Sequence, residues 1–297
     1  MKTERIGMTA LTPPPTDPLC GKATDPQYLY SIEGYAHWRC RRCGIVINYP
    51  QPSDEALAKI YSESYFDVTG RSVNPEGARK AKLRTFHRNY QWVVDKLPAG
   101  AKVLDIGAGE GFAMEVAREL GYDVYGLELS ESAYQQLVHK FGADRIFHTN
   151  IEAFEASLQF DLITMFDLIE HPRNPAQVVS KVAQMLRKGG FLMISTPDTG
   201  SLSARLMGKH WVHYKPEHLF YFNKQNITEL LRPYFENIQV HSHKKLLTKE
   251  YIAAYNTTYI RPPLQQIVAL GLTLLPRGMT ISLPSGELFA MARKSAA

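Results

Sequence analysis

Apolar and polar positions follow two alternating periods across the middle of the chain, from about residue 102 to residue 195. Short apolar runs indicate strands, and longer stretches with apolar residues at helical spacing lie between them. The expected strands are Lys102–Ile106, Asp123–Leu127, Arg145–His148, Phe160–Phe166 and Phe191–Ser195, and the helices are Gly111–Leu120, Ser130–Phe141 and Pro175–Leu186. This alternation predicts an α/β fold with a doubly wound parallel sheet covered on both faces.

The regions on either side have other patterns. Residues 53–98 predict two helices that cover the core. Residues 197–223 are rich in aromatic and histidine residues and predict a loop or lid over the substrate, and residues 246–283 are apolar without a clear period and predict a further cover. Strands are expected at Ile238–His243 and Leu288–Arg293. The predicted divisions are a disordered leader (1–16), a cysteine module (17–52), the helical cover (53–98) and the α/β domain (99–297).

A glycine-rich loop follows the first strand of the alternating region. Glycines 107, 109 and 111 occupy alternate positions, and a helix begins at once. Glycine permits a tight turn and a close ligand approach, so the loop predicts a nucleotide site at the carboxyl edge of the sheet. A dinucleotide site would need a small residue at Phe112, and Asp105 would repel a pyrophosphate. Asp105 suits a ligand with a cationic amino-acid end, such as S-adenosylmethionine (SAM), and a nicotinamide oxidoreductase is disfavoured.

An acidic residue ends the next strand. Glu128 can accept hydrogen bonds from both ribose hydroxyls of a bound nucleotide. The alternative is a helix-capping carboxylate before Ser130. Because the glycine loop lies at the correct place upstream, ribose binding is favoured.

Four ordered motifs resemble those of the class I SAM-dependent methyltransferases. They are Asp105–Gly111, Glu128, Phe160–His171 and Leu186–Leu192. The resemblance implies a Rossmann-like sheet of seven strands whose last strand is antiparallel. It also implies the cofactor contacts: Gly107, Ala108 and Gly109 near the methionine part, Leu129 beside the adenine, Asn150 and Ile151 at the adenine edge, and Phe166 beside the sulfonium.

Three histidines are candidates for the base that methyl transfer to oxygen usually needs: His171, His213 and His218. The alternative for His171 is a structural brace before Pro172, and the alternative for His218 is packing.

The segment Trp211–Phe222 resembles one found in ubiquinone-type O-methyltransferases and sugar methyltransferases. Within this segment, Trp211, Tyr214 and Tyr221 are expected to contact the substrate. Phe220 and Phe222 are expected to be core residues of a strand.

The three cysteines resemble a zinc ribbon in which one ligand is replaced. Cys40–Gly44 matches one knuckle, and Asp17–Gly21 stands at the place of the other, with Asp17 in the position of a cysteine. Some sugar methyltransferases and their relatives have a similar module. The expected ligands of a structural zinc are Asp17, Cys20, Cys40 and Cys43. His37 is a substitute ligand, and a degenerate ribbon without metal is the alternative.

Composition restricts the partners. The net charge of +5 comes from Lys and Arg residues spread along the chain, so nucleic-acid binding is not indicated. The apolar stretch Leu264–Leu275 is too short to span a bilayer, and Met1–Thr16 lacks the apolar region of a secretory signal. A cytoplasmic location is expected.

These observations predict a SAM-dependent methyltransferase of a small-molecule acceptor, with O-methylation of a sugar or of a phenolic or quinol compound favoured. One alternative is C- or N-methylation of a natural-product intermediate. Another is a non-catalytic SAM-binding interaction protein. The sequence does not indicate the oligomeric state, for which a homodimer is one option.

Overall fold

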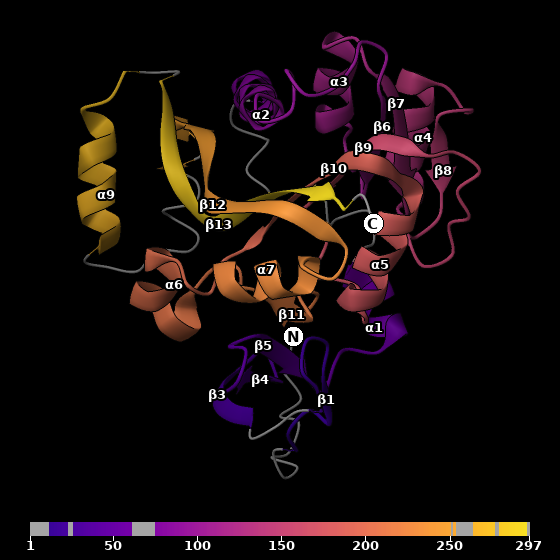
Figure 1. Cartoon of the computed structure of the whole chain (residues 1–297). Coiled ribbons are helices and arrows are strands. Elements are labelled where there is room, and N and C mark those ends of the chain that lie inside the picture. The colour runs from indigo at the N-terminus through magenta and orange to yellow at the C-terminus, as the bar shows by residue number, and fades with distance from the viewer. Residues whose placement is uncertain are drawn as a thin grey trace.

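A computed structural model describes residues 12–22, 26–60, 75–250, 252–253, 264–276 and 279–295. Within these ranges the strands form three sheets, of which the largest has seven strands in the order β12-β13-β10-β9-β6-β7-β8 (Figure 1). Their bounds are β6 Lys102–Ile106, β7 Asp123–Glu128, β8 Ile146–His148, β9 Phe160–Phe166, β10 Leu186–Pro197, β12 Phe235–Thr248 and β13 Thr280–Lys294. Strands β6 to β10 are parallel, whereas β13 is antiparallel to both β10 and β12. The predicted seven-stranded sheet with a reversed last strand is confirmed.

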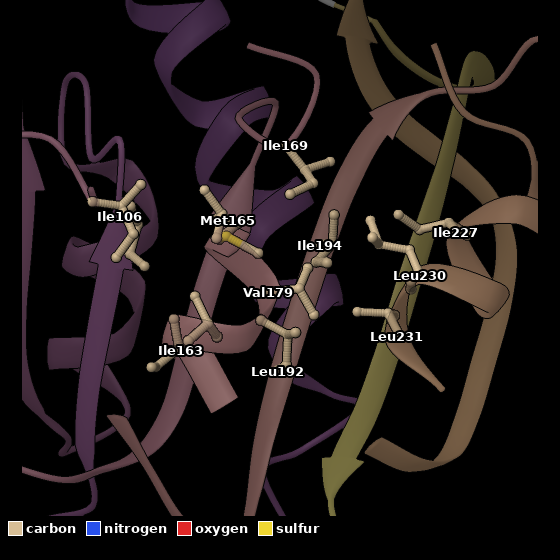
Figure 2. Packing of buried hydrophobic residues seen from close by; sticks show 14 of the residues in the cluster. Ile106, Ile163, Met165, Ile169, Val179, Leu192, Ile194, Ile227, Leu230 and Leu231 are labelled. Carbon is tan, nitrogen blue, oxygen red and sulfur yellow. The ribbon is translucent and has the colours of Figure 1, made fainter. Parts of the chain in front are cut away.

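The period-two pattern of the strands divides their side chains between two helical layers. On one face, Ile163 and Ile194 pack with α5 (Pro175–Met185) and α7 (Lys224–Leu231), as Figure 2 shows. On the other face, residues such as Leu162 pack with the layer formed by α2 Pro75–Tyr90, α3 Phe112–Glu119 and α4 Glu131–Phe141. Each fully buried aliphatic side chain stabilises the fold by roughly 1.5–3 kcal/mol. Both faces of the sheet are therefore covered, and ligands can reach it only at its edges.

The C-terminal strands are longer than predicted. Beyond the sheet, residues 244–248 of β12 pair with residues 280–284 of β13, so the two strands continue as a hairpin. The amide of Leu246 donates to Thr85 Oγ1 of α2 at 2.9 Å, which ties the hairpin to that helix. The helix α9 (Leu264–Thr273) lies near the far end of the hairpin. The segment predicted as a cover is thus partly hairpin, and residues 251, 254–263 and 277–278 of it lie outside the described residues.

The N-terminal part forms a separate four-stranded sheet. Its strands, in the order β11-β5-β4-β3, are β3 Pro26–Ile32, β4 Tyr35–Cys40, β5 Val46–Tyr49 and β11 Phe220–Tyr221. β11 comes from the segment predicted as a loop, which also contains α6 (Leu202–Met207) and the short η2 (Gly208–His210). The hairpin of β1 (Thr16–Asp17) and β2 (Gly21–Lys22) precedes this sheet. Residues 1–11 of the predicted leader lie outside the described residues.

The helical cover begins and ends at identifiable residues. α1 (Asp54–Ile60) is capped by Ser53, whose hydroxyl accepts from the amide of Ala56 at 3.2 Å. α2 ends at Tyr90, within the predicted helical cover of residues 53–98, and beyond it the amides of Trp92 and Lys96 bond carbonyls three residues back. None of the helices within the described ranges combines the length and the apolar character needed to cross a membrane.

Candidate active site

The glycine loop lies between β6 and α3 at the carboxyl edge of the parallel strands. Gly107, Gly109 and Gly111 have φ angles of 74°, 54° and 75°, the left-handed region that favours glycine. A Cβ at Gly111 would lie 2.6 Å from Leu137 Cδ2. The amides of Gly107 and Ala108 both donate to the carbonyl of Leu127, so the loop is joined to β7. The loop therefore requires glycine for conformation and for close packing.

Glu128 is buried between the glycine loop and the start of α4. Its Oε2 accepts from the amide of Gly109 at 2.7 Å, and its Oε1 accepts from the amide of Ser130 at 2.8 Å. Because Ser130 directly precedes α4, the second bond fits the alternative of a helix-capping carboxylate as well. Each carboxylate oxygen has two lone pairs, so each could accept one further bond from a ribose hydroxyl. Ribose binding stays a prediction.

Asp105 lies inside β6 and is buried. Burial raises the pKa of its carboxyl to about 7, the hydrogen bond from Thr164 opposes this rise, and the charge of Glu128 adds to it. Thr164 Oγ1 donates to Asp105 Oδ1 at 2.6 Å. A cationic amino group placed beside Asp105 would favour the ionised carboxylate.

The predicted adenine-side residues follow β7 and β8 at the same edge of the sheet. The side chain of Leu129 is 58% exposed, and its carbonyl lies 2.9 Å from His148 Nε2. Asn150 is exposed and its Oδ1 accepts from the amide of Ala153, whereas Ile151 is buried. An exposed leucine beside the buried Glu128 could contact one face of an apolar ring.

Phe166, at the end of β9, is half-buried, and its ring centroid lies 5.2 Å from that of Phe86 of α2. This edge of the sheet therefore combines an apolar surface with the glycine loop and two acids. These features fit the adenine, the amino-acid end and the ribose of SAM.

Beyond the end of β9, His171 and His218 come together with Glu170. The two rings lie 4.9 Å apart, and ligand atoms of all three residues lie within 4.8 Å of one another. Glu170 Oε2 accepts from Thr196 Oγ1, and its buried Oε1 has no hydrogen-bond partner within the part of the chain that the structure describes. A carboxylate and two imidazoles can relay a proton or bind a divalent metal.

The three predicted histidines are tied to backbone carbonyls. His171 Nδ1 lies 3.0 Å from the carbonyl of Glu217, and His218 Nδ1 lies 2.8 Å from the carbonyl of His213. Burial lowers the pKa of His171 to about 4, and it lowers the pKa of His218 well below its usual value and that of His213 less strongly. All three imidazoles are therefore neutral near pH 7, and each is a weak base. His213 itself lies apart from the pair, with Nε2 3.0 Å from the carbonyl of Ser285.

A charged group beside this edge was not identified from the sequence. Lys245 Nζ lies 3.0 Å from Asp167 Oδ2 and 2.7 Å from Glu287 Oε1. Ser195 Oγ also donates to Asp167, which has a φ of 53° directly after β9. Burial alone would raise the pKa of Glu287, but Lys245 and a hydrogen bond from His243 hold it well below its usual range. In the sequence, only the position of Asp167 directly after β9 could have indicated this group, because Lys245 and Glu287 come from the distant strands β12 and β13.

The aromatic residues predicted to contact substrate are buried. Trp211, Tyr214 and Tyr221 pack in one cluster with Val46 of β5. Trp211 Nε1 donates to Ser203 Oγ at 3.2 Å, and the hydroxyl of Tyr221 donates to the carbonyl of Lys215 at 3.0 Å. These side chains join the 211–221 segment to the N-terminal sheet. Contact with the substrate stays a prediction for them, whereas Phe220 and Phe222 are buried as expected.

The four predicted zinc ligands come together between β1 and the turn after β4. Their ligand atoms lie within 4.8 Å of one another, with Cys20 Sγ 4.0 Å from Cys40 Sγ and Cys43 Sγ 3.2 Å from Asp17 Oδ2. Tetrahedral zinc with Zn–S bonds of about 2.3 Å needs sulfur atoms about 3.8 Å apart. Burial raises the pKa of the Cys43 thiol, a cost that a bound cation would offset. The residues present therefore fit four-coordinate zinc.

Comparison with known proteins finds methyltransferases of similar sequence. The ubiquinone biosynthesis O-methyltransferase of Thiobacillus denitrificans is 32% identical over 113 residues, which are 36% of this chain and 49% of the relative. That of Aromatoleum aromaticum is 36% identical over 104 residues, or 33% and 44% of the two chains. The chain thus spans about half the length of these curated relatives.

Solved structures show the same fold. The plantazolicin methyltransferase BpumL, crystallised with a pentazolic analogue and S-adenosylhomocysteine (SAH), superposes with a TM-score of 0.50 at 19% identity, covering 81% of this chain and 95% of that chain. A family model described as a methyltransferase domain matches residues 76–240. Because that match covers more than half of the 297 residues, the chain belongs to the methyltransferase-domain family, within the class I group whose cofactor is SAM.

Proposed function

We propose that this chain is a SAM-dependent methyltransferase that methylates an oxygen of a small molecule, and that the acceptor is a phenolic or quinol compound rather than a sugar. The observation that carries the proposal is the grouping of Asp105, Glu128 and the glycine loop at one edge of the sheet. The names of the ubiquinone O-methyltransferase relatives support oxygen as the methylated atom.

The residues at this edge would act mainly by positioning. SAM, when bound, supplies the methyl group and its own leaving group. Glu128 would hold the ribose through the second lone pair of each oxygen, and Asp105 would pair with the amino group. Because neither acid is placed to take the proton that the acceptor hydroxyl loses, removal of that proton falls to the residues beyond β9.

The weak basicity of the histidines favours an acidic acceptor. An imidazole whose pKa is about 4 removes a proton from a phenol, with a pKa of about 10, far more readily than from an ordinary alcohol. His171 and His218 are the candidates, because their rings lie together beside Glu170. This argument favours a phenolic or quinol acceptor over a sugar.

Lys245 also favours a phenolic or quinol acceptor. Asp167 and Glu287 raise its pKa against the opposing effect of burial, so its ammonium stays charged. Two of its three N–H groups donate to these carboxylates. The third would donate to an acceptor oxygen and stabilise the negative charge that develops as the hydroxyl proton leaves.

The test is SAH release from purified protein and SAM with catechols, quinols, glycosides and nucleotide sugars. Turnover of catechols or quinols, with the methyl position assigned by NMR, is the expected result. Glu128→Ala serves as the control with an impaired cofactor site. Turnover of sugars alone would overturn the acceptor class, and a product methylated at carbon or nitrogen would overturn O-methylation. Absence of SAM and SAH binding would overturn the enzymatic proposal.

The histidines can be separated by single substitutions on the acceptor found in this way. We expect His171→Ala or His218→Ala to lower kcat by about 10²–10⁴-fold, the usual contribution of a general base. His213→Ala, whose ring lies apart from the pair, is the matched control. Full turnover by both variants with unchanged folding would show that neither histidine acts as the base.

We also propose that the four ligands of the N-terminal cluster hold one structural zinc, and that the protein acts in the cytoplasm. Cys20, Cys40 and Cys43 are all free thiols. A reducing compartment keeps thiols free for metal binding. No open coordination position would be left, so this metal would not take part in the reaction.

A further inference from the structure

The helix α2 contacts β12 on one side and α3 on the other, as its place in Figure 1 shows. Two buried side chains attach it to β12. Thr85 Oγ1 accepts from the amide of Leu246 at 2.9 Å, and Asn89 Oδ1 lies 3.1 Å from His243 Nε2. Because Thr85 and Asn89 are one helical turn apart, the two contacts fix the rotation of α2 about its own axis. Phe86, which follows Thr85, therefore has a defined direction.

That direction is towards the carboxyl edge of the parallel strands. The ring of Phe86 contacts that of Phe166, the residue that ends β9. The next residue, Asp167, accepts from Lys245 Nζ, and Lys245 directly precedes the Leu246 that bonds α2. The end of β9 and the hairpin of β12 and β13 thus both bring Phe86 close to Lys245.

The two phenylalanine rings form an apolar wall beside a charged group. Phe86 and Phe166 are both half-buried, so part of each side chain is accessible to a ligand. A phenyl ring has no hydrogen-bond donor or acceptor, so a sugar hydroxyl placed against it would lose the bond that it makes with water. An aromatic ring of the ligand would instead gain an edge-to-face or offset contact.

We propose that Phe86 determines acceptor specificity by contacting the ring of the acceptor while the acceptor oxygen lies at Lys245 Nζ. This inference rests on the proposed function, since it takes the acceptor to be phenolic or quinolic. One end of the acceptor would meet the phenyl rings and the other end the ammonium. A purely structural role, in which Phe86 only packs α2 onto the sheet, would not distinguish between ligands.

Binding of catechol to the complex of the protein with SAH, followed by NMR titration, tests the inference. The matched ligand is trans-1,2-cyclohexanediol, which carries two hydroxyls on a saturated ring. We expect the wild type to bind catechol at least about tenfold more tightly than the diol. Phe86→Leu keeps an apolar side chain and removes the ring, so it should reduce this ratio to about two or less. Phe86→Tyr keeps the ring and should keep the ratio.

Phe191→Leu is the matched control. Phe191 is also half-buried and packs on the same core cluster as Phe86. It pairs with Leu162 rather than with the end of β9, so it lies away from the carboxyl edge. This variant should keep the wild-type ratio. Calorimetric titration of SAH into both leucine variants, together with their melting temperatures, checks that the cofactor site and the fold are retained.

The failure of this inference can be distinguished from the failure of the proposed function. An unchanged ratio in Phe86→Leu, with catechol still methylated, would overturn the role of Phe86 and leave the proposed function in place. An equal fall of the ratio in both leucine variants would show that Phe86 acts only by packing. Methylation of sugars and not of phenols by the wild type would overturn the proposed function, and the role of Phe86 with it.

Discussion

At the scale of single residues, Asp105 and Glu128 differ in the hydrogen bonds that their carboxylates accept. Glu128 accepts two backbone amides, whereas Asp105 accepts one hydroxyl and is otherwise buried. Burial and the neighbouring Glu128 therefore raise the pKa of Asp105 to about 7. Asp105 should consequently affect the stability of the protein near neutral pH.

Because the folded-state pKa of Asp105 lies above the usual value of about 3.9 for an aspartate, the folded state keeps a proton that the unfolded state releases between about pH 4 and 7. The free energy of unfolding should therefore fall as pH rises through this window. Asp105→Asn removes this dependence. Urea unfolding at pH 5 and pH 8 should show the wild type losing about 2–3 kcal/mol relative to the variant. Parallel pH profiles would contradict the raised pKa.

Glu128→Ala tests the ribose assignment. Loss of the hydrogen bonds to ribose should weaken SAH binding by about 1–3 kcal/mol, measured by calorimetry. Glu155→Ala removes a carboxylate whose side chain is 95% exposed, so it should leave the dissociation constant unchanged. An unchanged constant in Glu128→Ala as well would remove Glu128 from the cofactor site.

Candidate site residues could be predicted from the sequence where they stand at a fixed distance from a recognisable strand or loop. Asp105 and Glu128 each stand at a fixed place relative to a strand and the glycine loop, and a single chain shows that order. Lys245 and Glu287 meet Asp167 only through tertiary contacts between β9, β12 and β13. No local pattern marks such a group, so it could not be predicted.

At the scale of elements, the strands with two buried faces were predictable and the hairpin was not. The bounds expected for β9 agree with the structure because both of its faces are apolar and buried. Beyond the sheet, β12 and β13 contact mainly each other and α2: Leu246 and Thr248 of β12 are buried, whereas residues 280–284 of β13 are partly buried or exposed without alternation. Their apolar pattern is correspondingly weak, which explains why residues 246–283 resembled a cover.

The junction of the glycine loop with α3 and α4 can be tested by Gly111→Ala. An alanine at this position would be strained by the left-handed φ that glycine tolerates. Its Cβ would also clash with Leu137. Gly121→Ala is the matched control, since Gly121 has a φ of 83° and open space around it. We expect about 1–2 kcal/mol of destabilisation for the control and about 1–3 kcal/mol more for Gly111→Ala. Equal effects in urea unfolding would show that Leu137 moves aside freely.

At the scale of the whole molecule, the cysteine cluster is linked to the segment that contains His218 through the N-terminal sheet. β5 pairs with β11, the amide of Asn48 donates to the carbonyl of Leu219, and Asn48 Nδ2 donates to the carbonyl of Pro216. His218 lies between these two bonded residues. Loss of metal from the cluster should therefore loosen the segment that holds His218.

Elemental analysis should find one zinc per chain. Chelation, or Cys43→Ser, should remove the zinc and lower Tm by roughly 5–10 °C, because metal binding contributes to folding. Arg42→Ala changes an exposed residue between the ligands and should retain both the zinc and Tm. Purified protein that carries no zinc and gains no Tm when zinc is added would support the degenerate ribbon.

The pairing of β11 with β5 also affects how the protein can be divided. A fragment that ended before residue 220 would leave β5 as an open sheet edge, and open edges promote aggregation through strand pairing. Conversely, a fragment without the N-terminal sheet would leave Phe220 and Tyr221 without their strand partner and would expose the aromatic cluster. The small sheet is thus not an independently folding unit, and the two parts of the chain have to be expressed together.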